Sequence, residues 1–248
     1  MKKNLLFFAF LTISVIAAQP DSIKLATGEW PPFTSSEMSD GGFFTELVSE
    51  IADHMGVEVE ILFYPWRRCY DAVVKGTVWA AFPYSYTEER AAEVLYSDTI
   101  IDSRSRLFYY TGNDPEKVYI YNELEDLGRY RMGGVIGYFY EQTFLDAGID
   151  VDYAAKEIQA IEKLIRGRID LLPLNELVGW HLIRENFPDE AGHFQTMEKP
   201  FEQNGLHLIV SKTYPGSVAL AERLNDSLRV MKKNAAFKAI LEKYNIKE

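Results

Sequence analysis

The first half of the chain alternates between two spacings of apolar residues, and each spacing predicts one kind of element. Residues 22–28, SIKLATG, and residues 57–63, VEVEILF, are predicted strands, the second because its first positions alternate between apolar and acidic side chains. Between them, apolar residues recur at helical spacing from Phe44 and stop at Gly56. A short helix over residues 67–75 then leads into the apolar run VWAAF.

The second half of the chain repeats this alternation. Its predicted strands are YRMGGVIG, IDLLPL and GLHLIVS, and its predicted helices are YEQTFLDAG, EIQAIEKLIRG, NELVGWHLIREN and two C-terminal helices over residues 218–232 and 235–244. Alternating strands and helices predict an α/β architecture with mainly parallel sheets. Ligands of such sheets bind beyond the carboxyl ends of strands. We therefore expect four strand ends to form one polar cleft: ATGEWPPF, AAFPYSYTEER, VIGYFYEQ and LPLNE.

Residues 1–18 have the three-part pattern of a secretory signal peptide. Two lysines precede an apolar run over residues 5–16, and small residues follow it. A membrane anchor is the alternative, but the run is short for a spanning helix and ends in a cleavage-like site. We therefore expect export to the periplasm, with cleavage near Ala18.

Composition narrows the class of protein. The 248 residues are 47% hydrophobic and 25% charged, as in an ordinary globular chain of one large or two small domains. The net charge of −11 makes nucleic acid or an anionic membrane a poor partner. Cys69 is the only cysteine and lies far from the leader, so we expect neither a lipoprotein nor an intramolecular disulfide.

The segment SYTEERAAEVLYSD, residues 85–98, places an arginine where a helix start favours acidic side chains. Ser85 and Thr87 are both candidate helix starts. With Thr87 as the N-cap, Arg90 takes the third helical position, at the positive end of the helix dipole. A guanidinium beside the free N–H groups of a helix start can bind a carboxylate. The alternative is a solvated surface arginine paired with Glu93, three residues on.

Five segments, in the same order, resemble the periplasmic solute-binding proteins of ABC importers, family 3, the polar amino acid-binding type. They are GEWPPF, DGGFFTELVSEIADHMG, AAFPYSYTEERAAEVLYSD, VIGYFYEQTF and GRIDLLPLNE. The resemblance covers essentially the whole mature chain. It implies a two-lobe periplasmic binding protein fold (type II) with the ligand cleft between the lobes. Lobe 1 would be residues 20–110 plus 206–248, lobe 2 residues 111–205, with glycine-containing crossovers near YYTGN and EQNGL.

The resemblance also implies roles for residues of the first lobe. Arg90 would clamp a ligand carboxylate and Ser85 would hydrogen-bond it, while the Pro83 carbonyl would accept a hydrogen bond from the ligand's ammonium group. Trp30 would stack over the ligand, and its alternative role is that of a plain core tryptophan. The adjacent proline pair favours a fixed loop at Trp30.

In the second lobe, Gly137, Tyr138 and Phe139 match a helix start that gives backbone N–H groups to the ligand carboxylate. The alternative is ordinary strand-to-helix turn chemistry. Amino acid binders of this family place an aspartate five residues beyond the aspartate of the G-R-x-D segment, and it holds the α-ammonium group of the ligand. In this chain the G-R-x-D aspartate is Asp170, and the residue five positions later is Asn175. An amide carries no charge, so its interaction with a cation is weaker. Capping of the following helix is the alternative role of Asn175.

Four further residues are weaker candidates. Glu176 or Glu29 could supply the missing negative charge, and Trp66 with Arg67 could lie at the rim of the first lobe. Trp66 also fits a core position. The aromatic GYFY segment would narrow the pocket. Together with the basic YPWRR segment, it would suit a solute that is larger or more anionic than a simple amino acid.

The expected function is capture of a small carboxylate-bearing solute, an amino acid or a relative, for delivery to the membrane permease of an ABC importer. We expect a monomer. We also expect no cofactor and no metal site, because the four histidines are scattered and no catalytic motif is present. The alternatives are a dehydratase-like enzyme with Glu176 or Glu29 as general acid, and a sensor module that presents the solute to a receptor.

Overall fold

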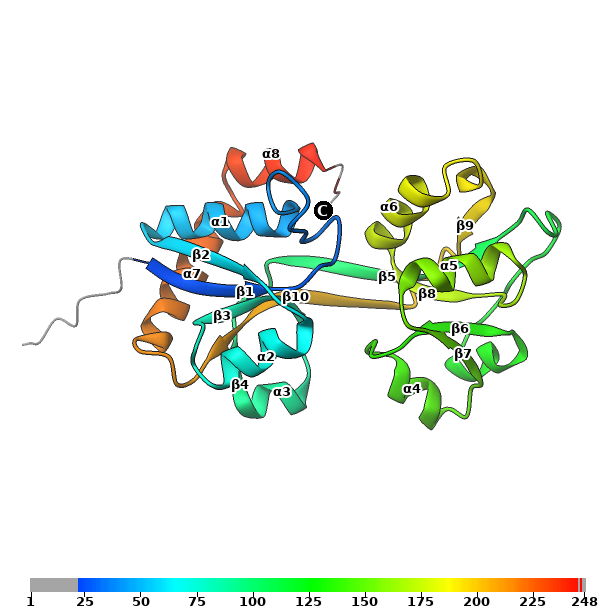
Figure 1. Cartoon of the computed structure of the whole chain (residues 1–248), viewed down its shortest axis with the longest axis horizontal. Helices are drawn as coiled ribbons and strands as arrows, with labels where there is room; N and C mark the ends of the chain where they lie inside the picture. The colour runs from blue at the N-terminus through cyan, green and yellow to red at the C-terminus, as the bar shows by residue number, and fades with distance from the viewer. Residues whose placement is uncertain (1–21, 245, 247–248) are drawn as a thin grey trace, which may run out of the picture.

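A computed structural model describes residues 22–244 and 246, so the predicted leader lies outside the described residues. Figure 1 shows two lobes side by side, connected by two long strands, β5 (Ile101–Tyr110) and β10 (Glu202–Ser211). In the part of the chain that the structure describes, no helix has the length and apolar character needed to cross a membrane.

The first lobe contains the N-terminal elements and the C-terminal helices. They are β1 (Ser22–Thr27), α1 (Phe43–Met55), β2 (Glu58–Phe63), α2 (Trp66–Val74), β3 (Ala80–Ser85), α3 (Glu88–Glu93), β4 (Val94–Tyr96), α7 (Ser217–Met231) and α8 (Ala235–Lys243). Each predicted element of this lobe is present within one to three residues of its expected bounds. The local pattern therefore predicts these elements well.

The second lobe contains the elements between the two long strands. They are the 3₁₀ helix η1 (Leu124–Arg129), β6 (Met132–Val135), α4 (Glu141–Asp146), β7 (Val151–Ala154), α5 (Glu157–Ile165), β8 (Leu172–Asn175), α6 (Glu176–Asn186), the 3₁₀ helix η2 (Ala191–His193) and β9 (Phe194–Thr196). The helices and strands predicted here are present, while β7 and β9 were not predicted.

The large sheet has the strand order β2-β1-β3-β10-β5-β8, with β4 also pairing with β10 and β9 with β5. Strands β2 and β3 run parallel to β1, and β6 runs parallel to β7. Every ladder of β5 or β10 is antiparallel. The expectation of mainly parallel sheets is therefore wrong, because the two strands that connect the lobes run in opposite directions through the sheet.

Strand β5 belongs to both lobes. Residues 101–105 pair with β10, residues 105–108 pair with β8, and residues 108–110 pair with β9. The predicted lobe boundary at residue 110 stays a prediction, and this pairing favours a crossover nearer Ser105. The second crossover, predicted at residues 202–206, coincides with the part of β10 that pairs with β5.

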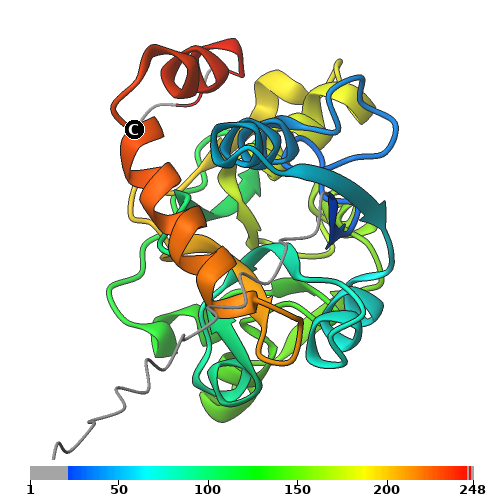
Figure 2. The same cartoon turned by 90° about the vertical axis from the view of Figure 1, so that its left-hand side faces the viewer.

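Helix α1 shows why the first lobe folds as it does. Its buried face includes Phe44, Leu47, Val48 and Ile51, at helical spacing, and Gly56 ends it with a φ of 67°, a conformation that glycine adopts without strain. Burial of each such side chain contributes about 1.5–3 kcal/mol. Figure 2, with this lobe toward the viewer, shows α7 (orange) crossing the near side and α8 (red) at its upper end.

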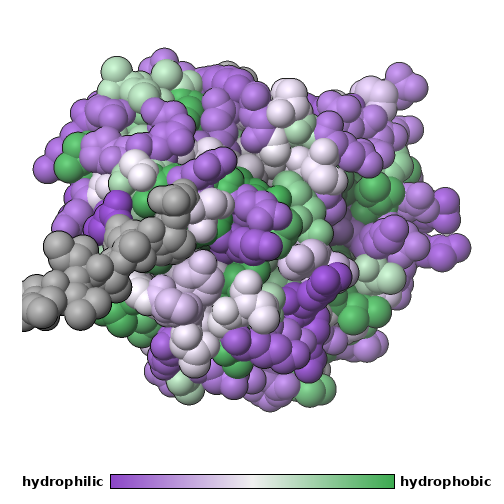
Figure 3. Space-filling model, turned by 60° about the vertical axis from the view of Figure 1, so that its left-hand side comes forward, coloured by the Kyte–Doolittle hydropathy of each residue, from purple (hydrophilic) through white to green (hydrophobic). Residues whose placement is uncertain are grey.

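Each lobe has an apolar core on both sides of its sheet. In the first lobe, α1, α7 and α8 cover one face and α2 covers the other. In the second lobe, α5 and α6 lie over one core and α4 with η1 over the other. On the side shown in Figure 3, the surface is mostly hydrophilic, with smaller hydrophobic patches. The lobes can thus hold their shape independently of the cleft between them.

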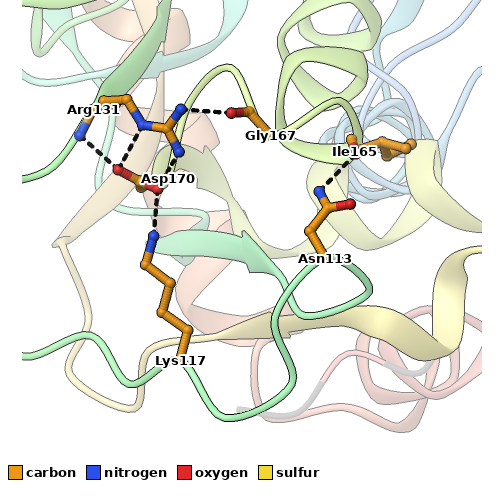
Figure 4. A network of polar contacts seen from close by, with 6 residues as sticks. All are labelled: Asn113, Lys117, Arg131, Ile165, Gly167 and Asp170. Carbon is orange, nitrogen blue, oxygen red and sulfur yellow. Dashed lines mark hydrogen bonds and ion pairs between the residues drawn. The ribbon is translucent and has the colours of Figure 1, made fainter.

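A buried aspartate ties three segments of the second lobe together (Figure 4). Asp170 accepts hydrogen bonds from the Lys117 ammonium group at 2.7 Å and from the backbone N–H and guanidinium of Arg131 at 2.7–3.1 Å. Arg131 also donates to the Gly167 carbonyl at 2.6 Å. Asp170, the aspartate of the G-R-x-D segment, is therefore a structural residue of the lobe, away from the cleft.

Candidate functional site

A small cavity lies between the lobes at the level of β5 and β10. The space is about 390 Å³, including the part that opens to solvent. Its nine lining residues are Trp30, Ser85, Ser103, Ser105, Tyr138, Phe139, Asn175, Glu202 and Asn204. Five of the eight principal candidates from the sequence meet here: Trp30, Ser85, Tyr138, Phe139 and Asn175.

Aromatic side chains from both lobes form the walls. Trp30, in the loop after β1, stacks on Phe33 with ring centroids 4.2 Å apart, which fixes the indole at the cavity. From the opposite lobe, the Tyr138 hydroxyl donates to the Glu157 carboxylate at 2.6 Å, and Phe139 is 45% exposed. An apolar solute face can therefore lie between rings that are held in place before binding.

The floor of the cavity comes from the two strands that connect the lobes. Ser103 and Ser105 lie two residues apart on β5, and Glu202 and Asn204 lie two residues apart on β10. In the antiparallel register, Ser103 is opposite Asn204 and Ser105 is opposite Glu202. Side chains two apart on a strand share a face, so all four point to the cavity. Sequence analysis missed them, although this alternation was visible in DSRSR and EQN.

Asn175 acts as the N-cap of α6 and uses its carbonyl oxygen for that purpose. Its Oδ1 accepts hydrogen bonds from the Leu177 and Val178 N–H groups at 3.0 and 3.1 Å. Its Nδ2 donates to the Ser103 hydroxyl at 2.6 Å. The two backbone donors fix which end of the amide is oxygen. Asn175 thus presents only donor groups to the cavity, and its interpretation as a helix cap is confirmed.

Replacement of Asn175 by alanine is expected to lower the free energy of unfolding by about 1–2 kcal/mol, because two N–H groups of α6 lose their acceptor. Asn175→Ser retains a capping oxygen and should recover more than half of that loss. Urea unfolding of the three proteins measures the difference. Equal stability of the alanine variant and the parent would contradict the capping role.

Arg90 lies beside the cavity wall without lining it. Of the two candidate helix starts, Thr87 is the N-cap of α3, and its hydroxyl accepts a hydrogen bond from the Arg90 N–H at 3.2 Å. The Arg90 guanidinium is 5.4 Å from the centre of the Tyr84 ring and donates to the carbonyl of Ser85 at 3.2 Å. Glu93, the predicted alternative partner, instead accepts a hydrogen bond from the Tyr70 hydroxyl at 2.6 Å. Within residues 22–244, no carboxylate forms an ion pair with Arg90.

Pro83 and Gly137 are close to the site in sequence but do not line the cavity. Pro83 is buried within β3. Gly137 has a φ of 81°, and its N–H, the predicted donor to a ligand carboxylate, donates instead to the Glu141 carboxylate at 2.8 Å. This backbone group therefore already binds a carboxylate of the chain itself.

The four weaker candidates lie outside the cavity. Trp66 packs with its ring against the Gly28 backbone and 5.7 Å from the Tyr84 ring, as a core residue does. The Arg67 side chain is 92% exposed. The Glu176 carboxylate forms an ion pair with Arg106 at 2.8 Å.

The fourth weaker candidate, Glu29, is held on the surface. Its carboxylate accepts hydrogen bonds from the Ser36 N–H and hydroxyl at 2.9 and 2.5 Å. Burial opposes ionisation of Glu29, but these hydrogen bonds and one from Ser35 lower its pKa. Neither Glu29 nor Glu176 supplies a free carboxylate to the cavity.

Glu202, by contrast, faces the cavity with a carboxylate that has no cationic neighbour among the nine lining residues. Burial raises the pKa of Glu202, and a hydrogen bond from Asn204 opposes that shift only in part. A carboxylate with a raised pKa in a cleft is a candidate functional group, because a cation bound next to it would relieve the cost of its burial.

Comparison with solved structures supports the two-lobe fold. An ancestral arginine-binding protein bound to arginine matches at 26% identity and a TM-score of 0.72, covering 91% of this chain and 98% of that one. A histidine kinase sensor domain similar to periplasmic binding proteins matches at 20% identity and a TM-score of 0.74, covering 90% and 95%. The ancestral amino acid-binding protein AncCDT-1, a precursor of cyclohexadienyl dehydratase, matches at 19% identity and a TM-score of 0.69, covering 90% and 95%.

A search of curated proteins finds no match. The profile of one protein family, however, matches residues 23–247, which is nearly all of the described chain. The predicted resemblance and the predicted two-lobe fold are thus both confirmed. The chain belongs to the bacterial extracellular solute-binding proteins, family 3.

Proposed function

We propose that this chain is an exported, monomeric binding protein of the periplasm that captures a small carboxylate-bearing solute, an amino acid or a relative, and delivers it to the permease of an ABC importer. The observation that carries the proposal is the cavity between the lobes, with aromatic walls from both lobes and a polar floor. Family membership supports a binding role rather than an enzymatic one.

Closure of the lobes is the physical basis of capture. A solute that contacts Trp30 of one lobe and Tyr138 of the other interacts with both only when the lobes are together. Such a ligand shifts the population toward the closed state by its differential affinity for that state. The lobes are joined through β5 and β10, so they can rotate about these strands while each core stays intact.

Three features support a carboxylate on the ligand. The Arg90 guanidinium has no carboxylate partner within residues 22–244, and it adjoins Ser85, which lines the cavity. Asn175 offers an N–H donor from the opposite lobe. A ligand carboxylate bound between them would receive charge-assisted hydrogen bonds from both sides of the cleft.

A thermal-melt screen of the mature protein tests this function. At a hundredfold excess over Kd, a ligand of the folded state adds about 2.7 kcal/mol of stability, or about 5–10 °C in Tm for a chain of this size. We expect such a shift with at least one carboxylate-bearing solute among amino acids, opines and dicarboxylates, and none with the matched alcohols. Failure of every carboxylate-bearing solute at 10-fold higher concentration would contradict the proposal.

The same experiment separates binding from catalysis. Incubation of the stabilising solute with the protein, followed by mass spectrometry, should return the solute unchanged. Its conversion would identify an enzyme instead. Uptake of the solute by vesicles that contain the cognate permease distinguishes an importer component from a sensor module.

A further inference from the structure

Glu202 is the one lining residue of the described cavity that has a carboxylate. It begins β10, at the crossover between the lobes, and lies opposite Ser105 of β5. Burial raises its pKa, and none of the other eight lining residues is a lysine, arginine or histidine. The other lining residues therefore give this carboxylate no cationic partner.

The neighbouring acidic groups cannot take this role, because each already has a partner. The Glu176 carboxylate pairs with Arg106 at 2.8 Å, and the Glu29 carboxylate accepts hydrogen bonds from Ser36. Asn175 has committed its oxygen to the start of α6 and turns an N–H donor toward Ser103. Among the nine described lining residues, Glu202 is the one charged acceptor for a cationic group of a ligand.

The register of the sheet places Glu202 away from the expected carboxylate receptor. Ser85, beside Arg90, lies opposite Leu206 of β10, and Glu202 lies four residues earlier on that strand. At about 3.4 Å per residue, the two positions are about 14 Å apart along β10. Ser85 and Glu202 thus line separate ends of the cavity, and Arg90 lies beside Ser85, outside the lining. This arrangement fits a solute with its carboxylate at one end and its cationic group at the other.

We propose that Glu202 binds the ammonium or guanidinium group of the ligand, and that the ligand is a carboxylic acid with its cationic group several bonds away, such as an ω-amino acid or a guanidino acid. This inference rests on the proposed function, because it assumes that the cavity is the solute site. Glu202, which lies on the connecting strand β10, then supplies the negative charge that Asn175 lacks. Specificity is set by the distance between Arg90 and Glu202.

Matched probes and variants test the assignment. L-Arginine and 5-aminopentanoate have a cation at the far end from the carboxylate, whereas glutarate has the same chain length as 5-aminopentanoate with a second carboxylate in its place. Isothermal titration should show binding of at least one of the two cationic probes and none of glutarate. Glu202→Gln keeps the shape of the side chain and should weaken that binding at least about tenfold.

Asp102→Asn is the matched control, since Asp102 is exposed on β5 next to Ser103 and lies on the other face of the same pair of strands. It removes one negative charge near the crossover without touching the cavity, so its affinity should equal that of the parent. The thermal melts of the ligand-free variants show that both are folded.

Three results would overturn the assignment of Glu202: binding of glutarate but of neither cationic probe, binding of no probe at all, or undiminished binding of the cationic probe by Glu202→Gln. The first and third results would leave the proposed function intact as long as Arg90→Ala still abolishes binding. Binding that is insensitive to both Glu202→Gln and Arg90→Ala would instead place the ligand elsewhere and contradict the proposed function itself.

Discussion

Arg90→Ala should abolish detectable binding of the solute that stabilises the parent protein. Loss of a charge-assisted, bidentate contact in a closed cleft costs about 2–5 kcal/mol, by analogy with buried charge pairs in interfaces, which corresponds to about 30-fold or more in Kd. Isothermal titration of the variant at the concentration that saturates the parent measures the loss. An affinity within threefold of the parent would contradict the role of Arg90 as the carboxylate clamp.

The variant should remain folded, because Arg90 contributes little to the fold. None of the residues of α3 is buried, and Thr87 caps the helix through the backbone N–H of residue 90, which alanine retains. The matched control is Arg67→Ala, which removes a guanidinium whose side chain is 92% exposed and outside the cavity. Its affinity should not change, so a loss confined to Arg90→Ala cannot come from net charge alone.

The helices and most strands could be predicted because their spacing of apolar residues is a local property. Helix α1 runs from Phe43 to Met55, against a predicted start at Phe44 and stop at Gly56. The N-cap of α3, Thr87, is one of the two helix starts that neighbouring residues alone indicated. Strand β5 was missed because residues 102–106 are all polar and residues 107–110 are all apolar or aromatic. Neither part alternates between apolar and polar side chains, as a strand with one buried face does.

The site was predicted in part, and its missing part has a physical cause. The sequence argument searched strand ends that lead into helices, and those ends do contribute Trp30, Ser85, Tyr138 and Asn175 to the cavity. The floor, including Glu202, lies within the connecting strands, whose position depends on pairing between residues about 100 positions apart. Such pairing cannot be read from one segment at a time.

Sequence neighbours of site residues were misleading for a related reason. Glu29 precedes Trp30 and Glu176 follows Asn175, yet both carboxylates are turned away from the cavity and hydrogen-bonded or paired elsewhere. Successive side chains of an extended segment point to opposite sides, and neither Glu29 nor Glu176 lines the cavity. Closeness in sequence therefore identifies the right loop but not the right side chain.

Asp170→Asn should lower the free energy of unfolding at pH 7 by about 2–4 kcal/mol, the second large effect, without altering the solute site. Asp170 is 8% exposed and accepts hydrogen bonds from both Lys117 and Arg131 (Figure 4), so its loss leaves two cations facing a neutral amide. Removing one partner of a fully buried pair costs about 3–5 kcal/mol. The smaller range, about 2–4 kcal/mol, is expected here because the Arg131 and Lys117 side chains are 58% and 39% exposed and can be partly solvated.

The pH dependence of this difference identifies its origin. Burial of Asp170 opposes ionisation, but hydrogen bonds from Arg131 and Lys117 outweigh it and hold the pKa of the carboxyl well below its usual range. A depressed pKa in the folded state stabilises the protein fully above the unfolded pKa of about 3.9, and this contribution is lost as the pH falls toward the folded value. The stabilities of parent and variant from urea unfolding should therefore differ by a constant amount between pH 5 and 7, and the difference should begin to shrink below about pH 4.

Asp152→Asn serves as the comparison within the same lobe. Asp152 pairs with Lys163 at 2.6 Å, but its side chain is 54% exposed, so its loss should cost less than about 1 kcal/mol. Equal losses for the two variants would mean that burial of Asp170 adds nothing to its ion pairs. A difference for Asp170→Asn that persists unchanged at pH 3 would assign its effect to packing rather than to charge, since only the charged form of the parent carboxyl is stabilised by Lys117 and Arg131.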